Sequence, residues 1–159
     1  MFNKLSFLLA TLFKVGYAPA APGTMGSLAT IPFAFFFAYY YGTLGVAIAT
    51  IISFIIGVIC IREVLKTSRH DPSFVVIDEF SGQMLTFLFV ADYLQFEGNN
   101  WLLYLLGFML FRVFDITKPF PVGWADKKIL NAWGVMLDDI FAGLYAGVIL
   151  YLFNYWINA

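Results

Sequence analysis

Long uncharged apolar segments, separated by short polar ones, dominate the chain. No charged residue occurs from Ser27 to Ile61, and a single helix of that length would extend about 52 Å, well beyond the roughly 30 Å hydrocarbon core of a bilayer. The glycine in Tyr41-Gly42-Thr43 permits a tight turn. The pattern therefore predicts two membrane helices, at 24–41 and 44–61, with a break at Gly42.

Two further apolar regions predict the remaining membrane helices. Residues 140–157 carry no charge and form the last expected crossing. Residues 80–96 and 101–111 predict a helical hairpin, because the turn-forming residues 97–100 join them. This hairpin either spans the membrane or re-enters it and packs inside the bundle. Asp92 lies deep in its first helix, where it either hydrogen-bonds within the bundle or shows that the helix has other boundaries.

The N-terminal segment, 1–14, has an apolar centre with Lys4 and Lys14 toward its ends. That arrangement favours an interfacial helix lying on the membrane, and a signal peptide is the alternative. Together the segments predict an all-α, polytopic transmembrane helical bundle of about five membrane helices plus the interfacial helix. We expect residues 1–159 to form a single integral-membrane domain.

The composition excludes several classes of protein. Hydrophobic residues make up 62% of the chain and charged residues only 12%, whereas soluble domains carry roughly 25% charged residues. So few charges cannot cover a small globule, which excludes a soluble monomer, a disordered chain and a nucleic-acid-binding module. One cysteine, Cys60, and one histidine, His70, exclude a disulfide framework and a His/Cys zinc site. The composition does not determine an oligomeric state.

The basic residues indicate how the chain is oriented. The predicted crossings place all nine of them on one side of the membrane, and by the positive-inside rule that side is cytoplasmic. They are Lys4, Lys14, Arg62, Lys66, Arg69, Arg112, Lys118, Lys127 and Lys128.

Two acidic pairs on the same side suggest a cation site. Asp78-Glu79 and Asp138-Asp139 are each predicted to open a membrane helix. Helix capping explains one such pair, because the helix dipole favours negative charge there. Two pairs on one face, with Asp115 between them in sequence, favour a bound cation, because clustered carboxylates otherwise repel one another. Oxygen ligands of this kind suit Mg²⁺ or Mn²⁺.

A band of alternating charge follows the predicted hairpin. Arg112-x-x-Asp115-x-x-Lys118 puts three charged residues on neighbouring turns of one helix, which Pro119 should end. These residues form either an intrahelical ion-pair ladder or a clamp in which Arg112 and Lys118 hold a phosphate.

A glycine-rich segment, 16–27, precedes the first membrane helix. Thr24 or Ser27 could cap that helix, and its free backbone N–H groups could cradle a phosphate. A plain capped turn would have the same sequence. His70 is expected to be a solvated loop residue, with proton donation to a leaving group as the alternative.

Four blocks of sequence carry a resemblance to a known family: Ala21-Pro-Gly-Thr-Met-Gly-Ser27, Asp78-Glu79-Phe-x-Gly82, Phe111-Arg-Val-Phe-Asp-Ile-Thr-Lys-Pro119 and Gly134-Val-Met-Leu-Asp-Asp-Ile-Phe-Ala-Gly143. In this order and spacing they resemble the phosphatidylglycerophosphatase A family of small bacterial inner-membrane lipid phosphatases. The resemblance implies Mg²⁺-dependent hydrolysis of the terminal phosphate monoester of phosphatidylglycerophosphate, giving phosphatidylglycerol. Residues 83–110 carry no family signature.

The resemblance also implies the functional residues. We expect Asp78, Glu79 and Asp139 to bind the metal, and Asp115, Asp138 and Asp139 to be catalytic. We expect the substrate phosphate to be bound by Thr24, Gly26, Ser27, Arg112 and Lys118. The motifs contain no cysteine or Ser/His nucleophile pair, so the expected reaction is in-line attack by a metal-activated water. An aspartyl-phosphate on Asp138 or Asp139 is the alternative.

Other classes of membrane protein fit the sequence less well. A small ion or proton transporter using buried carboxylates should present ionisable groups toward both faces, whereas only Asp92 and Glu97 approach the face opposite the basic residues. A phosphatidyltransferase is opposed by the absence of its Asp-x-x-Asp-Gly-x-x-Ala-Arg signature. A structural scaffold would leave the two acidic pairs without a purpose.

Overall fold

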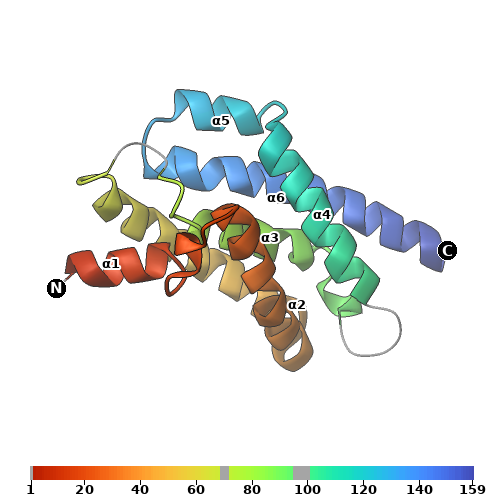
Figure 1. Ribbon diagram of the computed structural model, residues 1–159. Helices are drawn as coiled ribbons and strands as arrows, with labels where there is room; N and C mark the ends of the chain where they lie inside the picture. The colour runs from red at the N-terminus through yellow and green to blue at the C-terminus, as the bar shows by residue number, and fades with distance from the viewer. Residues whose placement is uncertain (1, 69–71, 95–100) are drawn as a thin grey trace.

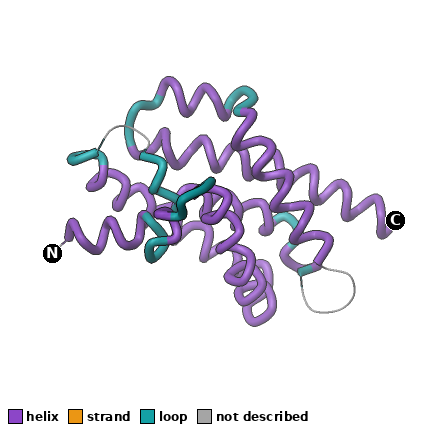
Figure 2. The backbone as a smooth tube through the Cα atoms, in the orientation of Figure 1, coloured by secondary structure: helices purple, strands orange, loops and turns teal. Residues whose placement is uncertain are grey.

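The computed structural model describes residues 2–68, 72–94 and 101–159, and every regular element in these ranges is helical. The predicted all-α class is therefore confirmed. Figure 1 shows the arrangement of the helices, and Figure 2 shows the short loops that join them. The elements are α1 (Phe2–Ala10), η1 (Val15–Tyr17), α2 (Pro22–Val64), α3 (Ile77–Leu88), η2 (Ala91–Tyr93), α4 (Trp101–Thr117), α5 (Val122–Lys128) and α6 (Ala132–Asn158).

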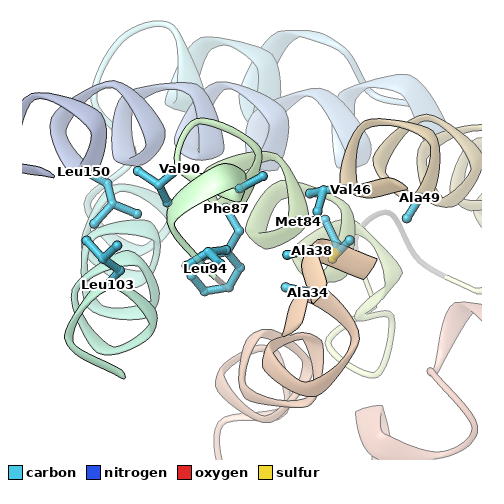
Figure 3. Close-up of a cluster of buried hydrophobic side chains, with 11 residues drawn as sticks. Ala34, Ala38, Val46, Ala49, Met84, Phe87, Val90, Leu94, Leu103 and Leu150 are labelled. Atoms are coloured by element: carbon cyan, nitrogen blue, oxygen red, sulfur yellow. The ribbon is translucent and has the colours of Figure 1, made fainter. Parts of the chain in front are cut away.

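Helix α2 is interrupted at the predicted position. Gly42 has φ 59° and ψ −156°, a conformation outside the helix region, so that two helical segments meet there. A positive φ of this kind favours glycine because a Cβ atom would be strained. Ala34 and Ala38, before the break, share one buried cluster with Val46 and Ala49, after it (Figure 3). The two segments therefore pack around the same core, as expected for a helical hairpin.

Within the part of the chain that the structure describes, two helices, α2 and α6, are long and apolar enough to cross a membrane. Large apolar side chains are exposed along α2, among them Ile51, Ile55 and Ile59, which recur every four residues on one face of the helix. A contiguous exposed apolar face of this kind is typical of a surface that contacts lipid or another apolar partner. Both observations indicate association with a membrane.

Helix α3 departs from the expected third crossing. It has 12 residues, about 18 Å of helix, and ends at Leu88, whereas a helix over 80–96 was predicted. Most of its residues are buried, and it packs against both α2 and α6. The prediction of one continuous helix over 80–96 is therefore wrong. Its burial between α2 and α6 fits packing inside the bundle, and whether the segment spans or re-enters the membrane stays a prediction.

The short element η2 explains Asp92. This residue lies beyond the end of α3, is exposed, and accepts a hydrogen bond from the Thr43 hydroxyl, next to the Gly42 break. Asp92 is therefore not a buried charge in a helix, and the bond places η2 and the α2 break at the same end of the molecule. The predicted turn at 97–100 and His70 lie outside the described residues.

The N-terminal segment is tied to the start of α3. Helix α1 ends at Ala10, earlier than the expected helix over 1–14, and Leu12, Phe13 and Lys14 have left-handed backbone conformations. The carbonyl of Ala10 accepts a hydrogen bond of 2.9 Å from the backbone N–H of Val76. This contact fixes the segment that leads into α3. The interfacial location of α1 stays a prediction.

Candidate functional site

Three carboxylates from two helices converge in the interior. Asp78 and Glu79 lie in the first turn of α3, and Asp139 comes from α6; one oxygen of each lies within 4.8 Å of the others. Asp78 is 5% exposed and Asp139 is 3% exposed. Within the described chain, Glu79 Oε2 and Asp139 Oδ1 have no hydrogen-bond partner. Buried oxygens of this kind are costly unless a cation or hydrogen-bond donor occupies the space between them.

Two glycines allow this convergence. A Cβ atom on Gly82 would lie 2.5 Å from the carbonyl oxygen of Asp139, and one on Gly143 would lie 2.4 Å from the carbonyl oxygen of Gly82. The backbones of α3 and α6 therefore touch, with no room for a side chain at either position. Since Gly82 lies one turn after Asp78 and Glu79, the contact brings those carboxylates close to Asp139.

The second acidic pair does not open a helix, contrary to the prediction. Helix α6 begins at Ala132, and its cap is Asn131, whose side-chain oxygen accepts a hydrogen bond of 2.9 Å from Trp133 N. Asp138 and Asp139 therefore lie about two turns inside the helix, where the dipole no longer stabilises them. Capping cannot account for these two buried carboxylates. Asp78 and Glu79 do lie at a helix N-terminus, as predicted.

Burial and neighbouring charges raise the pKa of Glu79 well above its ordinary value. Burial is the largest cause, and it is followed by repulsion from Asp78, a hydrogen bond with Asp78, and repulsion from Asp115; Arg112 partly offsets them. The raised pKa means that the ionised form of Glu79 is destabilised unless positive charge is supplied. The cluster therefore favours binding of a cation.

The charged band at the end of α4 divides into two parts. Arg112 Nη1 and Asp115 Oδ2 form an ion pair of 2.5 Å, in which both side chains are 14% exposed. Arg112 Nε is buried and has no hydrogen-bond partner among the residues that the structure describes. The predicted intrahelical ion pair is present for these two residues. Because Arg112 also lies beside the acidic cluster, it is suited to hold an anion there.

Lys118 pairs with carboxylates other than Asp115. Helix α4 ends at Thr117, close to the predicted end, and Lys118 follows in a left-handed conformation with φ 46°. Its ammonium donates to Asp126 Oδ1 at 2.7 Å and to Asp138 Oδ2 at 2.9 Å. Burial lowers the pKa of Lys118, but the two carboxylates outweigh burial, so that this pKa lies above its ordinary value. Lys118 is therefore a fixed positive charge at the edge of the cluster.

The glycine-rich segment contributes to the site through a residue that the sequence interpretation did not assign. Helix α2 begins at Pro22, so neither Thr24 nor Ser27 caps it. A Cβ atom on Gly23 would lie 2.1 Å from Glu79 Oε1 and 3.2 Å from Arg112 Nη1. The first turn of α2, with its free N–H groups, therefore faces the cluster. The signal in the sequence was a glycine directly after Pro22 at a helix start.

The other residues assigned to phosphate binding occupy different surroundings. Thr24 is half-buried in the first turn of α2. Ser27 is buried and donates a 3.0 Å hydrogen bond to the carbonyl of Gly23. A Cβ atom on Gly26 would lie 2.8 Å from Cβ of Val76. Gly26 thus lets α2 lie against the segment before α3, whereas Ser27 bonds within its own helix and Thr24 directly follows Gly23.

Gln83 is a second residue without an assignment from the sequence. It lies one turn after Glu79, is fully buried, and both of its amide atoms lack a partner among the described residues. An unpaired buried amide costs about 1–3 kcal/mol, so its position beside the carboxylates suggests a place in the polar site. The signal in the sequence was a polar glutamine within an apolar stretch, which indicates a buried polar contact.

Comparisons with known proteins agree with this geometry. The family model for phosphatidylglycerophosphatase A matches residues 8–154. The chain belongs to this family. It is therefore an enzyme, a hydrolase of phosphoric monoesters, and the transporter interpretation is not favoured. No solved structure matches the chain.

Three curated relatives cover most of this family member. Phosphatidylglycerophosphatase A of Escherichia coli (strain K12) is 34% identical, over 94% of this chain and 84% of the relative. Phosphatidylglycerophosphatase A of Haemophilus influenzae is 35% identical, over 94% of this chain and 88% of the relative. A Bacteroides thetaiotaomicron protein named "Putative phosphatidylinositol-3-phosphatase" is 34% identical, over 92% of this chain and 91% of the relative.

Proposed function

We propose that this protein hydrolyses the terminal phosphate monoester of phosphatidylglycerophosphate and releases phosphatidylglycerol, with Mg²⁺ as its metal and Mn²⁺ as a second candidate. Membership of the phosphatidylglycerophosphatase A family supports the substrate. The observation that carries the proposal is the meeting of Asp78, Glu79 and Asp139 at one point, next to Arg112.

The residues at this point fit a small hard cation. Asp78, Glu79 and Asp139 would hold it through carboxylate oxygens, which Mg²⁺ and Mn²⁺ prefer. The buried, unpartnered oxygens of Glu79 and Asp139 in the described chain fit such a ligand role. When bound, the metal would neutralise phosphate charge and make water a better nucleophile.

The cationic side chains would bind the remaining charge of the phosphate. The guanidinium of Arg112 offers planar paired donors, and Asp115 fixes its orientation through their ion pair. The first turn of α2, at Gly23 and Thr24, presents backbone N–H groups on the same side. These donors lie in a buried site, where electrostatic stabilisation of a transition state is stronger than in water.

Water is the proposed nucleophile. Asp138 is engaged by Lys118 and Asp115 by Arg112, so that both carboxylates hold cations in place. Asp139 is the remaining catalytic carboxylate, next to Asp78 and Glu79. In the proposed step, water forms the new P–O bond while the bond to the glycerol oxygen breaks, and the proton that the water loses is balanced by the one that the glycerol oxygen gains. A phosphorylated aspartate at Asp138 or Asp139 is the competing route.

We infer a multi-pass protein of the bacterial inner membrane, with the site on the cytoplasmic side. The apolar faces of α2 and α6 support membrane insertion. All nine basic residues were assigned to one side from the sequence, and the positive-inside rule makes that side cytoplasmic. The acyl chains of the substrate would then stay in the bilayer while its phosphate reaches the cluster.

The deciding experiment measures phosphate release by the purified protein in detergent or nanodiscs. Phosphatidylglycerophosphate should release phosphate with Mg²⁺ and should not do so with a chelator. Phosphatidylinositol 3-phosphate, suggested by the name of the third relative, serves as the competing substrate. Release from neither lipid with Mg²⁺ or Mn²⁺ would remove the proposed activity, and a liposome flux assay would then test transport.

A further inference from the structure

Lys118 is held between two carboxylates that come from different helices. Asp126 of α5 accepts one of its hydrogen bonds at 2.7 Å, and Asp138 of α6 accepts the other at 2.9 Å. The Asp138 side chain is 9% exposed, whereas that of Asp126 is 24% exposed. Asp126 thus lies on the outer side of Lys118, and the acidic cluster lies on its inner side.

The backbone around Lys118 is shaped so that Asp126 can reach it. Helix α5 packs against α6, and a Cβ atom on Gly123 would lie only 2.6 Å from the carbonyl oxygen of Lys118. Gly123 and Asp126 are three residues apart, so they share one face of α5. That face contacts both the backbone and the ammonium of Lys118, and α5 therefore acts as a support for this residue.

An ammonium group has three N–H donors. Among the described residues, Asp126 and Asp138 accept from Lys118 Nζ, which leaves one donor for a ligand. If only Asp138 held the ammonium, two N–H donors would be free, but a single hydrogen bond would not fix the direction in which they point. With Asp126 as a second anchor, Lys118 can donate to a phosphate oxygen and remain in place.

We propose that Asp126 is a positioning residue for the reaction, which directs the free N–H donor of Lys118 toward the phosphate of the substrate. This inference rests on the proposed function. Asp126 itself does not touch the substrate, and its effect passes through Lys118. Its loss should therefore weaken phosphate binding more than it slows the chemical step.

The test compares Asp126→Asn and Asp126→Glu with the wild type in steady-state kinetics on phosphatidylglycerophosphate. Asp126→Asn should raise KM and the inhibition constant of inorganic phosphate about tenfold, the size expected for weakening one charge-assisted hydrogen bond, with a smaller change in kcat. Asp126→Glu should restore most of the lost affinity. Glu63→Gln, which breaks the exposed Lys66–Glu63 pair on α2, should leave both constants unchanged.

A double-mutant cycle separates positioning from a structural role. In a Lys118→Ala background, Asp126→Asn should have no further effect on KM or on phosphate inhibition. An equal loss in both backgrounds, or an unchanged KM in a folded Asp126→Asn protein, would overturn the inference. Thermal unfolding of each variant, with and without inorganic phosphate, gives a readout that needs no turnover. If the wild type hydrolyses neither lipid, the proposed function fails, while the phosphate-dependent shift still tests Asp126.

Discussion

The backbone of Gly143 on α6 lies against the carbonyl of Gly82 on α3, so closely that a Cβ atom on Gly143 would be 2.4 Å from that oxygen. At this contact the helix that carries Asp78 and Glu79 lies directly against the helix that carries Asp139. Metal ligands must be placed to within a few tenths of an ångström. The two glycines are therefore as important for the candidate site as the carboxylates themselves.

Substitution of Gly143 by alanine should separate these helices. We expect Gly143→Ala to destabilise the protein by about 1–3 kcal/mol, the usual cost of overpacking, and to abolish phosphate release, because Asp139 moves away from Glu79. Gly57→Ala is the matched control. Its Cβ would meet the flexible thioether of Met136 at 2.5 Å, which can move aside. Chemical unfolding and phosphate release are the measurements, and equal effects of the two substitutions would contradict the prediction.

Removal of a carboxylate from the cluster should abolish metal binding. Asp78→Asn and Asp139→Asn should each lose more activity than the roughly 10–100-fold that loss of an outer-shell partner costs. Both variants should still insert into the membrane. In the wild type, Mg²⁺ at about 100 times its dissociation constant should raise stability by about 2.7 kcal/mol, and the two variants should lose this gain.

Asp92→Asn is a suitable control for this series. Asp92 bonds to Thr43, next to the break in the middle of α2, outside the acidic cluster, and asparagine can keep that bond. Its activity and its thermal shift with Mg²⁺ should equal those of the wild type. Near-normal turnover in both Asp78→Asn and Asp139→Asn would show that the cluster is not the catalytic site.

The raised pKa of Glu79 predicts how the stability of the metal-free protein depends on pH. The folded protein binds the proton of Glu79 more tightly than the unfolded chain does, whose carboxyl has an ordinary value near 4.5. Stability should therefore be greatest below that value and should fall as the pH rises toward the higher pKa of the folded state. Glu79→Gln should flatten this slope in unfolding experiments with a chelator. If the stability that Glu79 contributes rose with pH instead of falling, the raised pKa of Glu79 would be refuted.

Gly23 should be required for the geometry of the site rather than for folding. A Cβ atom there would lie 2.1 Å from Glu79 Oε1, so Gly23→Ala must displace a ligand carboxylate. A misplacement of about 1 Å can cost on the order of 100-fold in rate, and we expect a loss of that size with little change in unfolding temperature. Gly26→Ala instead meets Val76 and should lower the unfolding temperature. Kinetics and thermal unfolding of both variants, measured side by side, check this contrast.

Several local features followed from the sequence because their causes are local. Glycine at position 42 was expected to break the long apolar segment, and the positive φ of Gly42 is what breaks it. Pro119 was expected to end the fourth helix, and α4 ends at Thr117. The hydrophobic pattern likewise established the all-helical class. In each case the signal is steric or hydrophobic and acts within a few residues.

Helix boundaries that depend on packing were predicted less well. The start of α6 at Ala132 depends on Asn131 as a cap, whereas hydropathy alone placed the helix start after the acidic pair. Helix α3 ends at Leu88 although apolar residues continue beyond it. A buried internal helix need not match the thickness of a bilayer, so the length of the apolar segment did not predict where this helix ends. Hydropathy indicates whether a segment prefers water or an apolar environment. It carries no information on the packing and capping contacts that determine where a helix begins and ends.

The sequence by itself determined which chemical groups are available: two acidic pairs, the Arg112, Asp115 and Lys118 band, and a glycine-rich start to the first long helix. Only the tertiary structure decided which of these groups meet. In the folded protein Asp78 and Glu79 lie close to Asp139, and Gly23 lies against Glu79. Lys118 forms ion pairs with Asp126 and Asp138 rather than with Asp115. The physical reason is that these contacts depend on how closely separate helices approach, and that distance is determined by glycines on facing helices acting together.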